Sequence, residues 1–134
     1  MPDMTQPFVS PIDYLVIGHI TRDLTPEGER LGGAASFSGR MAQALGCKTA
    51  VLTSSGPQFQ WQHELPGIAI KTVPARETTT FENIYTPTGR QQIISAVAAR
   101  LRAEHLPEAW QRASIAHLGP VADEVEADMA RLFR

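Results

Sequence analysis

The stretch from Leu31 to Gly46, LGGAASFSGRMAQALG, constrains the fold of this chain more than any other. Phe37, Met41 and Leu45 recur every fourth residue, which places them on one face of a helix. Gly46 follows this pattern at the position where a left-handed C-terminal cap is expected. The stretch therefore predicts a helix that ends at a glycine.

A glycine pair, Gly32 and Gly33, precedes the first turn of this predicted helix. Backbone N–H groups at a helix start have no partner within the helix, and glycines have no Cβ to keep a ligand away from them. The helix dipole also favours oxygen-rich or anionic ligands at this end. The pair alone is equally compatible with tight packing of a helix against a sheet.

Apolar runs on both sides of the helix predict two buried strands. Asp13–Ile20, DYLVIGHI, is nearly continuously apolar, and Lys48–Thr53, KTAVLT, is the shorter second run. Such strands are typical of a parallel sheet covered on both faces, and a strand, helix and strand in this order predict a right-handed crossover. Asp23 follows the first run, where ligands collect in open α/β sheets, although aspartate is also a common turn residue. Leu24–Arg30, LTPEGER, is predicted to be a turn.

The next part of the chain predicts a strand and a hairpin. Gln58–Gly67 is ambiguous, whereas Ile68–Val73 alternates as a half-exposed strand does. Thr78–Thr86 is rich in β-branched and aromatic residues, and Arg90–Val97 is predicted to return beside it after a turn at Pro87–Gly89. Within this hairpin, Arg90 is a candidate for a surface pair with Glu82 across the strands.

The two ends of the chain differ in character. Residues 1–12 contain three prolines and few apolar anchors, and we expect a flexible arm. Leu106–Trp110 fits a short helix, and Ser114–Leu118 a buried strand. A final helix is predicted to begin at Asp123 and to turn Val125, Met129 and either Leu132 or Phe133 inward.

Composition excludes several classes of function. The chain has 134 residues, a net charge of −2 and no basic stripe, so nucleic acid is not an expected partner. Its single cysteine, Cys47, excludes an internal disulfide, and no histidine pair has metal-ligand spacing. His19 and His117 are interpreted as structural histidines with satisfied hydrogen bonds. No signal peptide or membrane-spanning run is recognisable, so we expect a cytoplasmic protein that binds no membrane.

The order of these features resembles the front half of the ribokinase-like, or PfkB, carbohydrate kinases. The matching pieces are HITRD, GGAASFSGR, TTTFEN, GRQQ and HLGPV, and they extend over residues 13–134. GGAASF and ETTTFE are most similar to the subgroup that includes inositol-kinase-like members. The resemblance implies an α/β fold: a mostly parallel sheet flanked by helices, with a small β lid hairpin, incomplete at the C-terminus of this chain.

The resemblance also implies a function and a site. Members of this family transfer the γ-phosphoryl group of ATP, with Mg²⁺, to a hydroxyl of a sugar or polyol. The aspartate after the first strand grips substrate hydroxyls in the family, which carries over to Asp23, and the glycine pair carries over to Gly32 and Gly33. A carboxylate accepts two hydroxyl donors in charge-assisted hydrogen bonds, which suits this role. Thr80 and Asn83 are further candidates, because they would belong to lid strands that close over the substrate.

Two departures from the family pattern modify this expectation. Phe37 stands where many members have an asparagine that bonds the substrate, so the identity of the sugar or polyol stays open. The GAGD-type segment with the general-base aspartate, which would lie beyond residue 134, is not present in the sequence. Phosphoryl transfer needs phosphate, metal and base together. We therefore expect a partial kinase that binds neither ATP nor Mg²⁺ fully and is inactive alone.

Two other functions compete with the kinase. A non-catalytic module could bind a small polyol at the same aspartate and glycines without phosphorylating it. A Rossmann-type nucleotide-binding domain is disfavoured, because the sequence has no G-x-G-x-x-G directly after the first strand. An open edge and an uncovered sheet face also predict self-association, as a homodimer through the lid or through the exposed sheet edge, or poor solubility.

Overall fold

A four-stranded parallel sheet forms the centre of the molecule. The computed structural model describes residues 11–133. Strands β1 (Tyr14–Ile17), β4 (Thr49–Ser55), β5 (Ala69–Pro74) and β8 (Ile115–Leu118) lie in the order β5-β4-β1-β8. All three neighbouring pairs are parallel, as the apolar runs predicted. The crossover from β1 to β4 contains the predicted helix, α1 (Ala34–Ala44).

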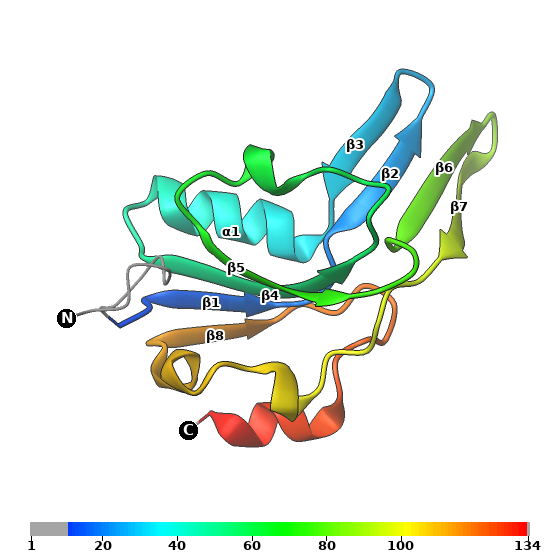
Figure 1. The fold of residues 1–134 in the computed structure, drawn as a ribbon. Helices are drawn as coiled ribbons and strands as arrows, with labels where there is room; N and C mark the ends of the chain where they lie inside the picture. Colours follow the sequence, from blue (N-terminus) through cyan, green and yellow to red (C-terminus); the bar gives the residue numbers. More distant parts are fainter. Residues whose placement is uncertain (1–10, 134) are drawn as a thin grey trace.

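Helix α1 covers one face of this sheet (Figure 1). Side chains alternate across a strand, so neighbouring residues of β1 enter different cores. Val16 packs on the side of α1 together with Ala35 and the fully buried Trp61. Leu15 and Ile17 pack on the opposite side. A strand buried on both faces explains why the run in β1 is continuously apolar.

Short 3-10 helices cover the opposite face of the sheet. These are η2 (Ala103–His105), η3 (Glu108–Arg112) and η4 (Ala127–Leu132), while η1 (Gln62–Glu64) lies in the segment between β4 and β5. The C-terminal element, drawn in red in Figure 1, lies across the sheet from α1. Met129 of η4 is fully buried in this second core. Both faces of the sheet therefore have a hydrophobic core.

A second sheet rises from the carboxyl end of the first (Figure 1). It consists of β2 (Thr21–Thr25), β3 (Gly28–Gly32), β6 (Thr80–Thr86) and β7 (Gly89–Ala96), in the order β3-β2-β6-β7. The β2–β3 and β6–β7 pairs are antiparallel hairpins, and β2 pairs with β6 in parallel over three residue pairs. We call this four-stranded sheet the lid sheet.

The β6–β7 hairpin confirms the predicted pair of lid strands, but the lid is larger than predicted. The prediction of a turn over Leu24–Arg30 was wrong, because only Pro26 and Glu27 turn and the flanking residues form β2 and β3. The polar sequence misled us because β2 and β3 are half-exposed, so no apolar run marks them. The suggested Arg90–Glu82 pair was also wrong, since the register sets Arg90 opposite Tyr85 and Glu82 opposite Ile93.

The C-terminal part departs from prediction in two places. Strand β8 is an edge strand with an exposed Ile115, not a buried strand. The final helix does not begin at Asp123, which has a positive φ of 57°, and the 3-10 helix η4 begins only at Ala127. Glu124 explains this difference, because its buried carboxylate binds backbone N–H groups and holds residues 121–124 in a tight bend. Met129 points inward as predicted.

Helix α1 ends at the predicted glycine, and its large apolar side chains lie on an exposed face. Gly46 has a φ of 94° and caps the helix as predicted. Phe37, Met41 and Leu45 share one face, but that face is exposed, with exposed fractions of 62%, 61% and 75%. The small residues of α1 face the sheet instead.

Residues 1–10 of the predicted arm lie outside the described residues, and Ile12 is buried in the core. No helix among residues 11–133 is long and apolar enough to cross a membrane.

Candidate polyol-binding site

Asp23 lies on β2, on the face of the lid sheet that turns toward the start of α1. Its Oδ1 accepts a hydrogen bond from the Thr21 hydroxyl at 2.7 Å. Its Oδ2 has no hydrogen-bond partner within residues 11–133. The Thr21 bond fixes the orientation of the carboxylate and leaves one oxygen available. An ionised carboxylate only accepts hydrogen bonds, so this oxygen suits a hydroxyl donor.

The glycine pair makes room for this carboxylate. Gly32 pairs with Thr21 across the β2–β3 hairpin, and a Cβ on Gly32 would overlap Oδ2 of Asp23 and come within 2.7 Å of the Thr21 hydroxyl. Gly33 has a φ of 90°, in the region that favours glycine, and a Cβ there would lie 2.6 Å from the His19 carbonyl oxygen. The glycines therefore permit close approach of the carboxylate and a sharp entry into α1.

A cavity of about 270 Å³ joins these groups. Its lining residues are Thr21, Asp23, Gly33, Phe81, Gln92 and Val121. The register explains the grouping, because Asp23 pairs with Phe81 and therefore projects from the same face of the lid sheet. The cavity contains a carboxylate, an amide and a hydroxyl beside an aromatic ring. This arrangement suits a small polar molecule that has both hydroxyl groups and C–H faces.

Asn83 does not line this cavity but is hydrogen-bonded to Gln92, which does. The register sets the two residues opposite each other, and Gln92 Nε2 donates to Asn83 Oδ1 at 3.2 Å. Asn83 itself lines a groove near the tip of the lid sheet. Gln92 was not predicted from the sequence. The alternation of side chains along the hairpin strands could have indicated that it lies on the same face as Asn83. The amide pair leaves the Gln92 carbonyl oxygen available to accept a further hydrogen bond.

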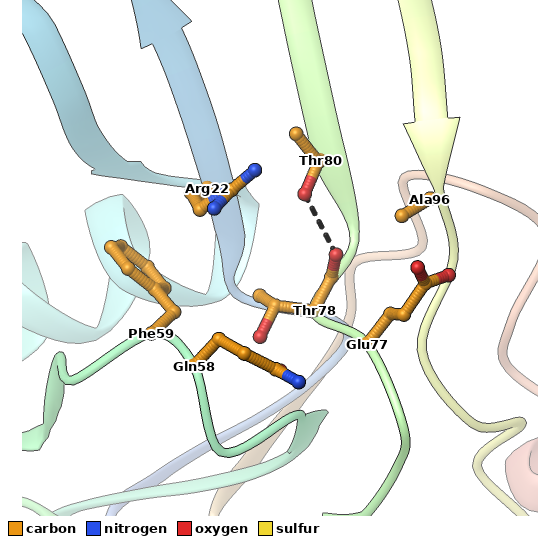
Figure 2. Close-up of a pocket in the computed structure, with 7 residues that line it drawn as sticks. All are labelled: Arg22, Gln58, Phe59, Glu77, Thr78, Thr80 and Ala96. Carbon is orange, nitrogen blue, oxygen red and sulfur yellow. Dashed lines mark hydrogen bonds between the residues drawn. The ribbon is translucent and has the colours of Figure 1, made fainter.

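Thr80 does not join Asp23. It pairs with Arg22, and adjacent residues of a strand project to opposite faces, so Thr80 lies on the other face of the lid sheet. Its hydroxyl donates to the Thr78 carbonyl oxygen at 2.8 Å, and it lines a different cavity with Arg22 (Figure 2). The structure therefore does not bring Thr80 together with Asp23, and a substrate contact by Thr80 stays a prediction. Phe37 lies on the exposed face of α1 and lines none of these cavities.

His19 connects the central sheet to the base of the lid sheet. The side chain is fully buried, with Nδ1 2.7 Å from the Thr79 hydroxyl and Nε2 2.6 Å from the Ala99 carbonyl oxygen. A neutral ring that donates from Nε2 and accepts at Nδ1 satisfies both contacts. Burial lowers the pKa of His19, against a smaller opposing effect of the bond to Ala99. The hydrogen bonds of His19 and the 2.6 Å contact of His117 Nδ1 with the Tyr14 hydroxyl fit the structural interpretation of both histidines.

The described residues do not form a recognisable metal-binding site. No group of three or more histidine, cysteine, aspartate or glutamate side chains within residues 11–133 is placed to hold a metal ion. We therefore assign no residue of this part of the chain to Mg²⁺ and derive no step through it.

The parallel sheet, the crossover helix and the lid sheet define a ribokinase-like fold. A pyrophosphate-dependent kinase of the ribokinase family, solved with a pyrophosphate analogue and myo-inositol, matches 89% of this chain with a TM-score of 0.68 and 22% identity. A microbiome-derived acarbose kinase matches 81% of the chain, with a TM-score of 0.60 and 17% identity. A fructokinase from Xylella fastidiosa matches 79%, with a TM-score of 0.56 and 18% identity.

This chain spans less than half of the length of those structures, between 40% and 46%. No family model matches the sequence, and no curated protein matches it. The three structures confirm the predicted fold class. Two of them are named as kinases of sugars, and the third kinase was solved with a polyol.

Proposed function

We propose that this chain supplies the polyol- or sugar-binding part of a ribokinase-like carbohydrate kinase. The observation that carries the proposal is the Asp23 carboxylate, held by Thr21 and backed by Gly32, which faces a small cavity with one oxygen available. Two adjacent hydroxyl groups of a polyol would donate to this carboxylate. Gln92, supported by Asn83, would accept from a further hydroxyl, and Gly33 would allow the ligand to approach the start of α1.

The reaction of the complete protein would be transfer of a phosphoryl group to one of these hydroxyls. Asp23 would orient the acceptor, while the general base and the phosphate-binding groups would come from outside the described residues. ATP with Mg²⁺ is the donor we propose. The similar kinase solved with a pyrophosphate analogue makes pyrophosphate the second donor to test. Closure of the lid sheet over the acceptor would exclude water from the transfer.

Myo-inositol is the first ligand to test, because one of the similar kinases was solved with it. Calorimetry should detect binding of myo-inositol or of fructose to the chain. Asp23→Asn should weaken binding about tenfold or more, since it replaces a charged acceptor with a neutral one. Glu27→Gln in the exposed turn of the same hairpin is the matched control and should bind as tightly as the unmodified chain. Equal affinity of the Asp23 and Glu27 variants would contradict the proposed site.

A coupled assay of ATP and pyrophosphate consumption tests whether this chain alone transfers a phosphoryl group. We expect binding without turnover for this chain alone. Turnover would show that residues within the chain supply the base. Absence of binding by every tested sugar and polyol would contradict both the kinase and the non-catalytic module.

A further inference from the structure

A second cavity lies on the face of the lid sheet opposite Asp23. It has a volume of about 230 Å³. Arg22, Gln58, Phe59, Glu77, Thr78, Thr80 and Ala96 line it (Figure 2). Arg22 and Asp23 are adjacent on β2, so the strand sends one side chain into each cavity. The two cavities therefore have different walls and different charged groups.

The inner wall of this second cavity is rigid. Phe59, Thr78 and Thr80 are buried, with exposed fractions of 8%, 5% and 3%. The Thr78 hydroxyl accepts a hydrogen bond from the Gly56 N–H at 2.9 Å, and the Thr80 hydroxyl donates to the Thr78 carbonyl oxygen at 2.8 Å. Because these hydroxyls are already oriented, a ligand would meet a wall that does not need to rearrange.

Arg22 has a donor group without a partner in the described part of the chain. Its Nη1 donates to Glu29 Oε1 at 3.0 Å, which holds the guanidinium in place. Its Nε is buried and has no hydrogen-bond partner within residues 11–133. A buried donor without an acceptor costs free energy. The Nε and Nη2 groups form one planar edge of the guanidinium, which matches the two oxygens of a carboxylate.

Glu77 limits the charge that this cavity accepts. Figure 2 shows Arg22 and Phe59 at one side of the cavity and Glu77 at the other. The Glu77 carboxylate would repel a second negative charge at its end and would accept hydrogen bonds from hydroxyl or ammonium groups. The walls thus favour a ligand with a carboxylate at one end and donors at the other.

We propose that this cavity is a binding site for a small hydroxy or amino carboxylate. Arg22 holds the carboxylate through its Nε edge, and Glu77 accepts hydrogen bonds from the donor groups. Phe59 covers the carbon chain between them. This site is separate from the proposed polyol site, because the two lie on opposite faces of the lid sheet.

Titration of the chain with four small probes tests this inference. Glycerate and serine carry the carboxylate and the donors, propionate lacks the donors, and inorganic phosphate carries a second charge. We expect glycerate or serine to shift the backbone amide resonances of Thr78 and Thr80 and to bind about tenfold tighter than propionate or phosphate. No shift with either at about 10 mM, or equal binding of propionate or phosphate, would overturn the proposal.

Variants at Arg22 test the proposed contact. Arg22→Gln and Arg22→Lys should each weaken glycerate or serine binding about tenfold, because neither presents the planar edge. Glu29→Gln is the matched control: it removes the negative charge beside Nη1 but keeps an oxygen that can accept the same hydrogen bond, so the guanidinium stays in place and the ligand should bind normally. Retained binding by Arg22→Lys would overturn the role of the edge. An unchanged unfolding midpoint and unchanged myo-inositol binding would show that the variants remain folded and that the first site is separate.

Discussion

The backbone N–H of His19 donates a hydrogen bond to the buried carboxylate of Glu124 at 2.7 Å, although 105 residues separate them in sequence. The same carboxylate accepts from the N–H groups of Val121 at 2.9 Å and Ala122 at 2.8 Å. Glu124 is 1% exposed. Its side chain therefore joins the segment after β1 to the bend after β8.

Removal of this carboxylate should destabilise the protein. Glu124→Ala leaves three N–H groups without their acceptor, that of His19 buried and those of Val121 and Ala122 part-buried, and we expect a loss on the order of 3 kcal/mol in the free energy of unfolding. Urea unfolding followed by circular dichroism measures this loss. Glu126→Gln, at a surface pair with Arg100, is the control and should leave the unfolding midpoint nearly unchanged. If the unfolding midpoint of Glu124→Ala shifted as little as that of the Glu126→Gln control, the role assigned to this carboxylate would be refuted.

Acid should destabilise the protein in two stages. Burial lowers the pKa of His19 below its ordinary 6.5, so the unfolded chain binds a proton near pH 6.5 that the folded protein does not yet bind. Stability should therefore begin to fall as the pH drops below 6.5. Burial raises the pKa of Glu124, but the N–H groups of His19 and Ala122 outweigh it and hold this pKa below 4.5. The stability from Glu124 is present above pH 4.5 and is lost as the pH falls through the folded pKa.

Unfolding measured at steps from pH 7 to pH 4 checks this order. His19→Gln should lower stability at pH 7 and remove the slope that begins near pH 6.5. His63→Gln, at an exposed position, controls for the loss of a histidine. A slope that persists unchanged in His19→Gln would show that another group causes it.

Gly32→Ala should weaken polyol binding without preventing folding. The added Cβ would displace the Asp23 carboxylate, which is a side chain that can move. We expect about a tenfold loss of myo-inositol affinity by calorimetry. Gly39→Ala is the control, because a Cβ there would meet Val51 at 3.4 Å, within ordinary contact, and alanine stabilises a helix interior by up to about 1 kcal/mol. Affinity should be retained in the control, and equal effects of the two substitutions would contradict the site geometry.

Trp61 should contribute strongly to the core on the side of α1. It is fully buried, and its Nε1 donates to the Ser55 hydroxyl at 3.0 Å. Trp61→Phe removes this bond and part of the ring, so we expect a loss of about 2 kcal/mol, with about 4 kcal/mol for Trp61→Ala. Half-buried Trp110 is the comparison site, and Trp110→Phe should cost less. Chemical unfolding followed by circular dichroism measures these losses. A larger loss for Trp110→Phe than for Trp61→Phe would contradict this ranking.

Local patterns made part of this structure predictable. The apolar run at β1, the glycine after α1 and the β-branched residues of β6 each reflect a physical requirement of their own segment: burial on both faces, a positive φ and a pleated backbone. Such features depend on neighbours within a few residues, so the sequence contains the information directly. Asp23 and the glycine pair were chosen from the family resemblance instead, and the structure brings them close together.

Other features depended on contacts between distant segments. Strands β2 and β3 are polar and half-exposed, and they are strands because the hairpin pairs with β6. That pairing also decided that Thr80 faces away from Asp23 and that Gln92 lies beside it. Tertiary contacts likewise left Phe37, Met41 and Leu45 exposed, since the small residues of α1 allow close packing on the sheet.

The sequence by itself determined the central parallel strands and the helix with its terminal glycine, whereas the choice of Asp23 came from the family resemblance. Only the tertiary structure decided the four-stranded lid sheet, the face on which each lid residue lies and the bend at Glu124. The physical reason is that strand register and buried hydrogen bonds join residues far apart in the chain. A shift of one residue in register would exchange the two faces of the lid sheet and, with them, the two cavities.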